Sequence, residues 1–225
     1  MLSIHLHSNG QVQLIDRNET PPSTRFVSLE SFIDVFRGQE NASPILPEGC
    51  VQYWRGTDYT IVALKRAAHK REMSIYSDES LYGSYTLPIP ATLFVFRVSN
   101  PENKVMTIIE SAIFTFFGDW KGVDTQLYSF PYGNIFDEQT ICWGDFEGTI
   151  QSIEQLDSFI DVFLSTPFND DLTPLFKQSD DIENSVSIFS FWEKMSLLPE
   201  VPEESLTPVC TYEEMPAYLT GELFF

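Results

Sequence analysis

The chain has 225 residues, of which 43% are hydrophobic and 19 are phenylalanine, and this content argues for a packed core rather than a disordered chain. Its 33 acidic residues outnumber its 13 basic residues, so the formal net charge is −20. A charge of this size argues against binding to nucleic acid or to anionic membrane surfaces. It favours a partner with a basic surface, or it serves solubility alone.

The cysteines, histidines and hydropathy of the chain indicate its compartment and the kinds of site it can contain. The chain has three cysteines, Cys50, Cys142 and Cys210, and no Cys-x-x-Cys pair. An odd number of widely spaced cysteines is typical of free thiols in a reducing compartment. No signal-peptide pattern and no apolar stretch of the roughly 18 residues that a membrane helix needs is found, so we expect a cytoplasmic protein. With 3 histidines in the chain, we predict neither a metal site nor a cofactor.

The N-terminal segment alternates apolar and polar residues over 2–8 and again over 11–16, on both sides of an Asn-Gly pair. This pattern predicts a β-hairpin, because Asn-Gly suits a tight turn between two strands. Residues 28–36 then place apolar side chains at helical spacing after a serine that suits an N-cap. We therefore predict that residues 1–50 form a hairpin and a helix packed on the core.

Short runs of strand character fill the next part of the chain. We predict strands at 51–54, 59–65, 73–76, 91–98, 104–110 and 113–117. The short connections between these runs favour an antiparallel meander. We predict a loop over 82–90, because its prolines cannot enter a central strand. Segment 66–71 concentrates basic residues, and it is either a solvated turn or a docking point for an acidic partner.

The apolar period changes after Gly148. Over 150–165, apolar residues recur at intervals of three and four residues, which predicts an amphipathic helix. Segment 186–195 is a second helix candidate. The tail, 199–225, is rich in proline and glutamate and ends on apolar residues, so it either packs on the domain or docks on a partner. The predicted fold class is α+β, an antiparallel sheet flanked by helices, with its core over 51–198.

One segment, 130–145, has a pattern with chemical meaning. Asn134 lies in a turn signal eight positions before Cys142. A thiol can hold an acyl group as a thioester, and a nearby amide can donate a hydrogen bond to the oxyanion that forms when the thioester is attacked. Four carboxylates lie close in sequence, at Asp137, Glu138, Asp145 and Glu147. They disfavour a thiolate, which argues against a redox or protease cysteine and leaves transthiolation open.

The same segment resembles the active-site segment of ubiquitin-conjugating enzymes. Tyr132-Gly133-Asn134 stands where that family has His-Pro-Asn, and Ile141-Cys142-Trp143 stands where it has Ile-Cys-Leu. Together with the run 88–94, the segment is most similar to the bacterial ubiquitin-conjugating-enzyme-like family D, also called PRTRC system protein B. The resemblance implies a ubiquitin-conjugating-like core over 51–198, with N-terminal and C-terminal additions.

The resemblance also implies an activity. The protein would accept a ubiquitin-like protein from an adenylating (ubiquitin-activating-like) enzyme as a thioester on Cys142, and would transfer it to a target nucleophile. The alternative is a non-catalytic relative that acts as an adaptor for a ubiquitin-like or adenylating partner. The missing His-Pro pair and the bulky Trp143 beside Cys142 support that alternative. Neither interpretation involves nucleic acid or a membrane.

Four residues form the predicted site. Cys142 is the nucleophile, or else a small buried hydrophobic residue. Asn134 stabilises the oxyanion, or else only braces the loop. Asp145 takes a proton from the acceptor amine, or else caps a turn. Tyr132 substitutes for the missing histidine by bracing Asn134, or else packs the turn.

Overall fold

The computed structural model describes residues 2–7, 11–16, 23–28, 45–56, 58–77, 81–99, 105–169, 172 and 188–219. The chain divides into two compact units, Met1–Pro44 and Ile45–Phe225. The larger unit contains all the predicted site residues.

The smaller unit contains a three-stranded antiparallel sheet in the order β1-β2-β3. Its strands are β1 (Leu2–Leu6), β2 (Gln11–Asp16) and β3 (Ser23–Ser28). β1 and β2 pair as a hairpin, and β3 is a strand that the sequence pattern did not reveal. The helix predicted over 28–36 starts at the last residue of β3, and the rest of it lies outside the described residues. The packing of 1–50 on the core therefore stays a prediction.

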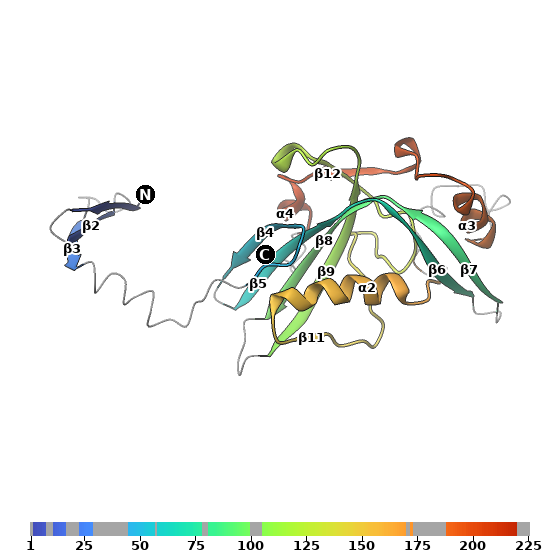
Figure 1. The fold of residues 1–225 in the computed structure, drawn as a ribbon, viewed down its shortest axis with the longest axis horizontal. Coiled ribbons are helices and arrows are strands. Elements are labelled where there is room, and N and C mark those ends of the chain that lie inside the picture. Colours follow the sequence, from blue (N-terminus) through green and yellow to red (C-terminus); the bar gives the residue numbers. More distant parts are fainter. Residues whose placement is uncertain are drawn as a thin grey trace. The chain divides into compact units, whose positions relative to one another are not determined.

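The larger unit is built on an antiparallel sheet with the strand order β12-β10-β9-β8-β5-β4 (Figure 1). The strands are β4 (Cys50–Arg55), β5 (Tyr59–Arg66), β8 (Ala91–Ser99), β9 (Met106–Phe116), β10 (Gln126–Tyr128) and β12 (Pro208–Thr211). A short strand, β11 (Thr149–Ile150), pairs with the start of β9. The predicted antiparallel sheet is confirmed. The runs predicted at 104–110 and 113–117 form one strand, because the residues between them continue the pairing with β8.

A second, two-stranded sheet lies between β5 and β8 in the chain. It consists of β6 (His69–Ser77) and β7 (Leu81–Ile89), which pair along their whole length. The loop predicted over 82–90 is therefore wrong, since most of that segment is β7. Pro88 is compatible with this strand because, among the described residues, β7 pairs with β6 alone, and an edge strand tolerates a proline.

The described residues include the α-helices α2 (Leu156–Ser165), α3 (Ile188–Ser196) and α4 (Met215–Tyr218). Short 3₁₀ turns lie at Gly122–Asp124, Ile153–Gln155 and Glu203–Ser205. The helix predicted over 150–165 begins later than expected, because its first residues form β11 and a 3₁₀ turn. The helix predicted over 186–195 matches α3 closely. No helix in the described part of the chain is long and apolar enough to cross a membrane.

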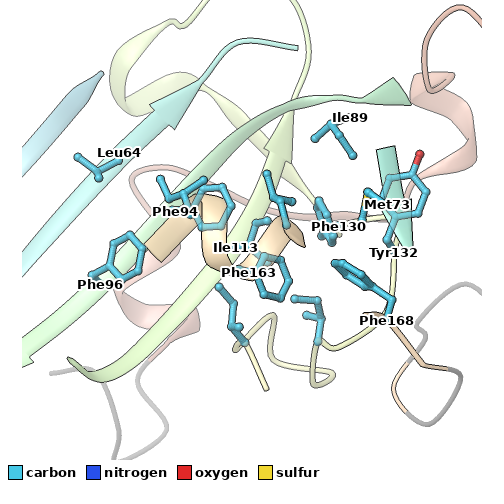
Figure 2. Packing of buried hydrophobic residues seen from close by; sticks show 14 of the residues in the cluster. Leu64, Met73, Ile89, Phe94, Phe96, Ile113, Phe130, Tyr132, Phe163 and Phe168 are labelled. Carbon is cyan, nitrogen blue, oxygen red and sulfur yellow. The ribbon is translucent and has the colours of Figure 1, made fainter. Parts of the chain in front are cut away.

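Both faces of the large sheet are covered. On one face α2 covers the strands (Figure 1) and contributes Ile160 and Phe163 to the core. Figure 2 shows Phe163 in this core together with Phe94 and Ile113. Burying each large apolar side chain contributes about 1.5–3 kcal/mol. On the other face, buried residues of the C-terminal segment pack against the strands, among them Met215. The tail thus packs on the domain as far as it is described.

The basic segment predicted at 66–71 fixes α2 against the strands. Arg66 forms an ion pair with Asp157 in the first turn of α2. Nη1 of Arg71 donates to Oδ1 of Asp161, one helical turn further on, at 2.7 Å. Nη2 of Arg71 also donates to the hydroxyl of Ser165 at 2.7 Å. The two arginines therefore serve an internal contact, which sets the position of the helix that follows the predicted site.

Candidate active site

Backbone hydrogen bonds fold the segment before Cys142 into a compact loop. The N–H of Phe136 donates to the carbonyl of Thr140, and the N–H of Gln139 donates back to Phe136, each at 2.9 Å. The N–H of Ile141 donates to the carbonyl of Ser111 in β9 at 2.8 Å, which attaches the loop to the sheet. The loop is therefore held at both its tip and its end.

Cys142 follows this attachment and lies outside the named strands, as predicted. Its N–H donates to the carbonyl of Asn134 at 2.9 Å, so the two residues that the sequence pattern linked are neighbours. The Cys142 side chain is partly exposed and lies in a groove of about 630 Å³. Cys142 is therefore not wholly buried, as a cysteine in a strand core would be.

Asn134 adopts the left-handed conformation, with φ 60°, which asparagine tolerates better than most residues. Its side chain is 8% exposed. The amide nitrogen donates to the carbonyl of Pro167 at 3.2 Å, and the amide oxygen accepts from the N–H of Asn169 at 3.3 Å. These contacts connect the loop to the chain just after α2. Such contacts are what Asn134 needs in order to brace the loop. Its role in stabilising an oxyanion stays a prediction.

Tyr132 is fully buried, and its hydroxyl donates to the carbonyl of Pro88 in β7 at 2.7 Å. Burial raises the pKa of this hydroxyl, so the side chain is neutral. Its ring packs against the rings of Phe130 and Trp192, with centroids 5.5 and 5.6 Å away. Figure 2 shows Tyr132 and Phe130 in the same core. The structure thus supports turn packing for Tyr132, and its suggested effect on Asn134 stays a prediction.

The carboxylates around the loop are accessible to solvent. Asp145 is exposed in the turn that follows Trp143 and Gly144, close to Cys142 in sequence. Its role as a proton acceptor stays a prediction. Glu147 is also exposed and, unlike Asp145, lines the groove that contains Cys142.

Two structural residues of the site were not identified from the sequence. The side-chain oxygen of Gln139 accepts from the N–H of Phe130 at 3.0 Å, and Gln139 is buried with φ 65°. The indole N–H of Trp143 donates to the hydroxyl of Ser111 at 2.7 Å, and its ring packs against Phe163 of α2. Trp143 thus anchors the loop that contains Cys142. Neither role has a sequence signal: the contact of Gln139 depends on how the loop folds back on Phe130, and that of Trp143 on Ser111, which is distant in the chain.

The other two cysteines have less favourable surroundings. Burial raises the pKa of Cys50, although its thiol donates to the carbonyl of Gln52 at 3.3 Å. Burial, and then the negative charge of Glu214, raises the pKa of Cys210 to about 11. A raised pKa lowers the fraction of thiolate, which is the reactive form, at neutral pH.

An antiparallel sheet with a helix on one face, and a loop before that helix that presents a cysteine, is consistent with the α+β fold of E2-like proteins, the ubiquitin-conjugating type. The sequence profile of prokaryotic E2 family D matches residues 23–209, and the chain belongs to this family. The match confirms the resemblance seen in the sequence, and it spans all four predicted site residues. No curated protein and no solved structure matches the chain significantly.

Proposed function

We propose that the protein is a ubiquitin-conjugating-like enzyme of a bacterial modification pathway. It accepts a ubiquitin-like protein from an adenylating enzyme as a thioester on Cys142, and it transfers this protein to a target nucleophile. The observation that supports the proposal best is the position of Cys142. Its partly exposed thiol lies in a groove, on a loop attached to the sheet, in a chain of prokaryotic E2 family D.

The chemistry is two acyl transfers. In the first, the Cys142 thiol gives its proton to solvent and its sulfur attacks the carbonyl of the incoming thioester. A new sulfur–carbonyl bond forms, the bond to the sulfur of the adenylating enzyme breaks, and that sulfur leaves as a thiolate and takes a proton from solvent. In the second, the acceptor attacks the Cys142 thioester, the bond between the carbonyl carbon and the Cys142 sulfur breaks, and Cys142 leaves as a thiolate that takes a proton from solvent. When the acceptor is an amine, it loses a proton, and the exposed carboxylate of Asp145 is our candidate to receive it.

Asn134 has two roles in this proposal. Its hydrogen bonds to Pro167 and Asn169 brace the loop. An amide nitrogen has two hydrogens, so the contact with Pro167 leaves one available for the oxyanion. The carbonyl of Asn134 accepts a hydrogen bond from the N–H of Cys142, so the backbones of the two residues are neighbours.

The test is reconstitution. The protein is incubated with ATP, the adenylating enzyme and the ubiquitin-like protein of the same pathway, and adducts are separated with and without a thiol reductant. We expect a reductant-sensitive adduct that Cys50→Ser and Cys210→Ser leave unchanged. Cys142→Ser should lose the adduct or convert it to a reductant-resistant ester. Equal effects of the three serine variants would refute the assignment of Cys142.

A non-catalytic adaptor is the second candidate. It is favoured by the engagement of both amide atoms of Asn134 in loop contacts, because these contacts alone account for the residue. In that case the protein would bind the ubiquitin-like or adenylating partner without forming an adduct. Binding that is unchanged in Cys142→Ser, together with no adduct in the wild type, would support the adaptor.

A further inference from the structure

Two residues of the loop before Cys142 have an unusual backbone. In the described part of the chain, Asn134 and Gln139 are the only residues other than glycine with a positive φ, at 60° and 65°. A positive φ costs an ordinary residue free energy, whereas glycine adopts it readily. Residues held in such a conformation cluster at functional sites. The backbone alone would favour glycine at position 139, so the side chain of Gln139 has a use of its own.

Each polar group of Gln139 has a partner, although the residue is only 3% exposed. The side-chain oxygen accepts from the N–H of Phe130 at 3.0 Å, and the side-chain nitrogen donates to the carbonyl of Asp137 at 3.5 Å. The backbone N–H donates to the carbonyl of Phe136, and the backbone carbonyl accepts from the N–H of Ile113 in β9, each at 2.9 Å. Gln139 thus joins three parts of the chain: the segment that enters the loop, the tip of the loop and β9.

The bond between Gln139 and Phe130 closes the loop around its two predicted reactive residues. Phe130 lies four residues before Asn134, and Gln139 lies three residues before Cys142. Phe130 is fully buried in the core (Figure 2), so its N–H depends on this acceptor. The cross-links nearer the tip of the loop join backbone atoms, whereas this one is made by a side chain. A substitution can therefore remove it and leave the others in place.

We propose that Gln139 is a positioning residue for the transfer reaction. Its side chain fixes the segment before Asn134 relative to the segment before Cys142, and so keeps the Asn134 amide in one position relative to the thioester. The inference rests on the proposed function, in which that amide donates to the oxyanion. Gln139 contacts neither the thioester nor the acceptor, and it acts through Asn134 and Cys142. A donor displaced by about 1 Å can cost about 100-fold in rate.

Three substitutions separate the side-chain acceptor from the backbone conformation. Gln139→Met retains the length of the side chain and the cost of the positive φ, but it lacks the acceptor oxygen. Gln139→Gly lacks the acceptor and removes the cost of the positive φ. Gln139→Glu retains that cost and an oxygen that can accept from Phe130, whether or not the carboxyl group is protonated.

We expect the rate of discharge from loaded Cys142, measured in single-turnover assays, to follow the acceptor. Gln139→Glu should discharge within about threefold of the wild type, and Gln139→Met and Gln139→Gly about 10- to 100-fold more slowly. The melting temperatures should follow a different order. Gln139→Gly should melt above Gln139→Met because it relieves the backbone, and Gln139→Glu should melt below the wild type because it buries a carboxyl group.

Hydrogen exchange tests the same geometry in the full-length protein without any transfer chemistry. The N–H of Cys142 donates to the carbonyl of Asn134, and this bond should open more often when the cross-link is lost. We expect the Cys142 amide to exchange about tenfold faster in Gln139→Met and Gln139→Gly, and at the wild-type rate in Gln139→Glu. The amide of Ile108, which donates to the carbonyl of Gly148 at 2.8 Å, is the control and should be unchanged.

The two proposals can fail separately. Discharge rates that follow the melting temperatures, with Gln139→Gly faster than Gln139→Glu, would overturn the positioning role and leave the proposed function intact. A wild-type protein that forms no adduct would refute the proposed function, and exchange at Cys142 then decides the positioning role. Faster exchange in the two variants without the acceptor supports it, and unchanged exchange overturns it.

Discussion

Asn134 is the residue whose variants separate structure from chemistry. Changing Asn134 to alanine removes two side-chain hydrogen bonds. It also leaves an ordinary residue on a backbone with φ 60°, where the left-handed conformation costs roughly 1–2 kcal/mol. We expect a lower melting temperature. Losing an oxyanion donor should also slow discharge of a loaded Cys142 by roughly 100- to 1000-fold, measured in single-turnover assays.

Asn134→Gly is the matched control, because glycine lacks the amide but adopts a positive φ readily. It should melt above Asn134→Ala while discharging as slowly. If both variants discharge at the wild-type rate, the amide has no oxyanion role, and the hydrogen bonds to Pro167 and Asn169 are its whole contribution.

At the scale of elements, α4 connects the C-terminal segment to the loop before Cys142. The hydroxyl of Tyr218 donates to the carbonyl of Asp137 at 3.3 Å, and its ring packs on Phe114, with centroids 6.0 Å apart. Tyr218→Phe should retain the ring contact and lose the hydrogen bond, which is worth about 0.5–1.5 kcal/mol. We expect faster hydrogen exchange at the amides of Gln139 and Cys142, with little change in the melting temperature.

Tyr212→Phe provides the comparison within the same segment. The hydroxyl of Tyr212 donates to the side-chain oxygen of Gln52 in β4 at 2.6 Å, away from the loop. Its loss should leave exchange in the loop unchanged. If the two variants alter the loop equally, the effect comes from the general packing of the C-terminal segment rather than from the bond to Asp137.

The elements that the sequence predicted well are those with a periodic pattern of their own. The helix α2 follows from apolar residues at helical spacing, of which Ile160 and Phe163 are buried as that spacing requires. β7 was missed because Pro88 argues against a central strand, and no local signal indicates an edge strand. The bulge at Ile109 was also missed, since it is defined by pairing with β8 rather than by residue type.

The site was also predictable only where the residues involved lie close together in the sequence. The spacing of Asn134 and Cys142 identified two residues that a backbone hydrogen bond joins at 2.9 Å. The partners of Asn134 after α2, and the anchoring of Trp143 by Ser111, could not be predicted, because those contacts join segments that are distant in sequence.

At the scale of the whole molecule, the excess of negative charge has a consequence for stability. The net charge of −20 causes self-repulsion in the compact state. The ion pairs of Arg66 with Asp157 and of Arg71 with Asp161 are partly exposed, so each contributes only about 0–1 kcal/mol. Salt weakens both the self-repulsion and the ion pairs. Because the repulsion involves many more charges, its loss should dominate the effect of salt on stability.

We therefore expect the melting temperature to rise when sodium chloride is raised from about 0.01 M to about 0.15 M, where the Debye length falls from about 30 Å to about 8 Å. A gain of about 1 kcal/mol corresponds to a rise of roughly 2–4 °C for a protein of this size. The rise should shrink as the pH is lowered toward the isoelectric point, because fewer carboxylates are then ionised. A melting temperature that falls with salt at neutral pH would mean that ion pairs such as Arg71–Asp161 outweigh the repulsion, and that α2 depends on them more than their exposure indicates.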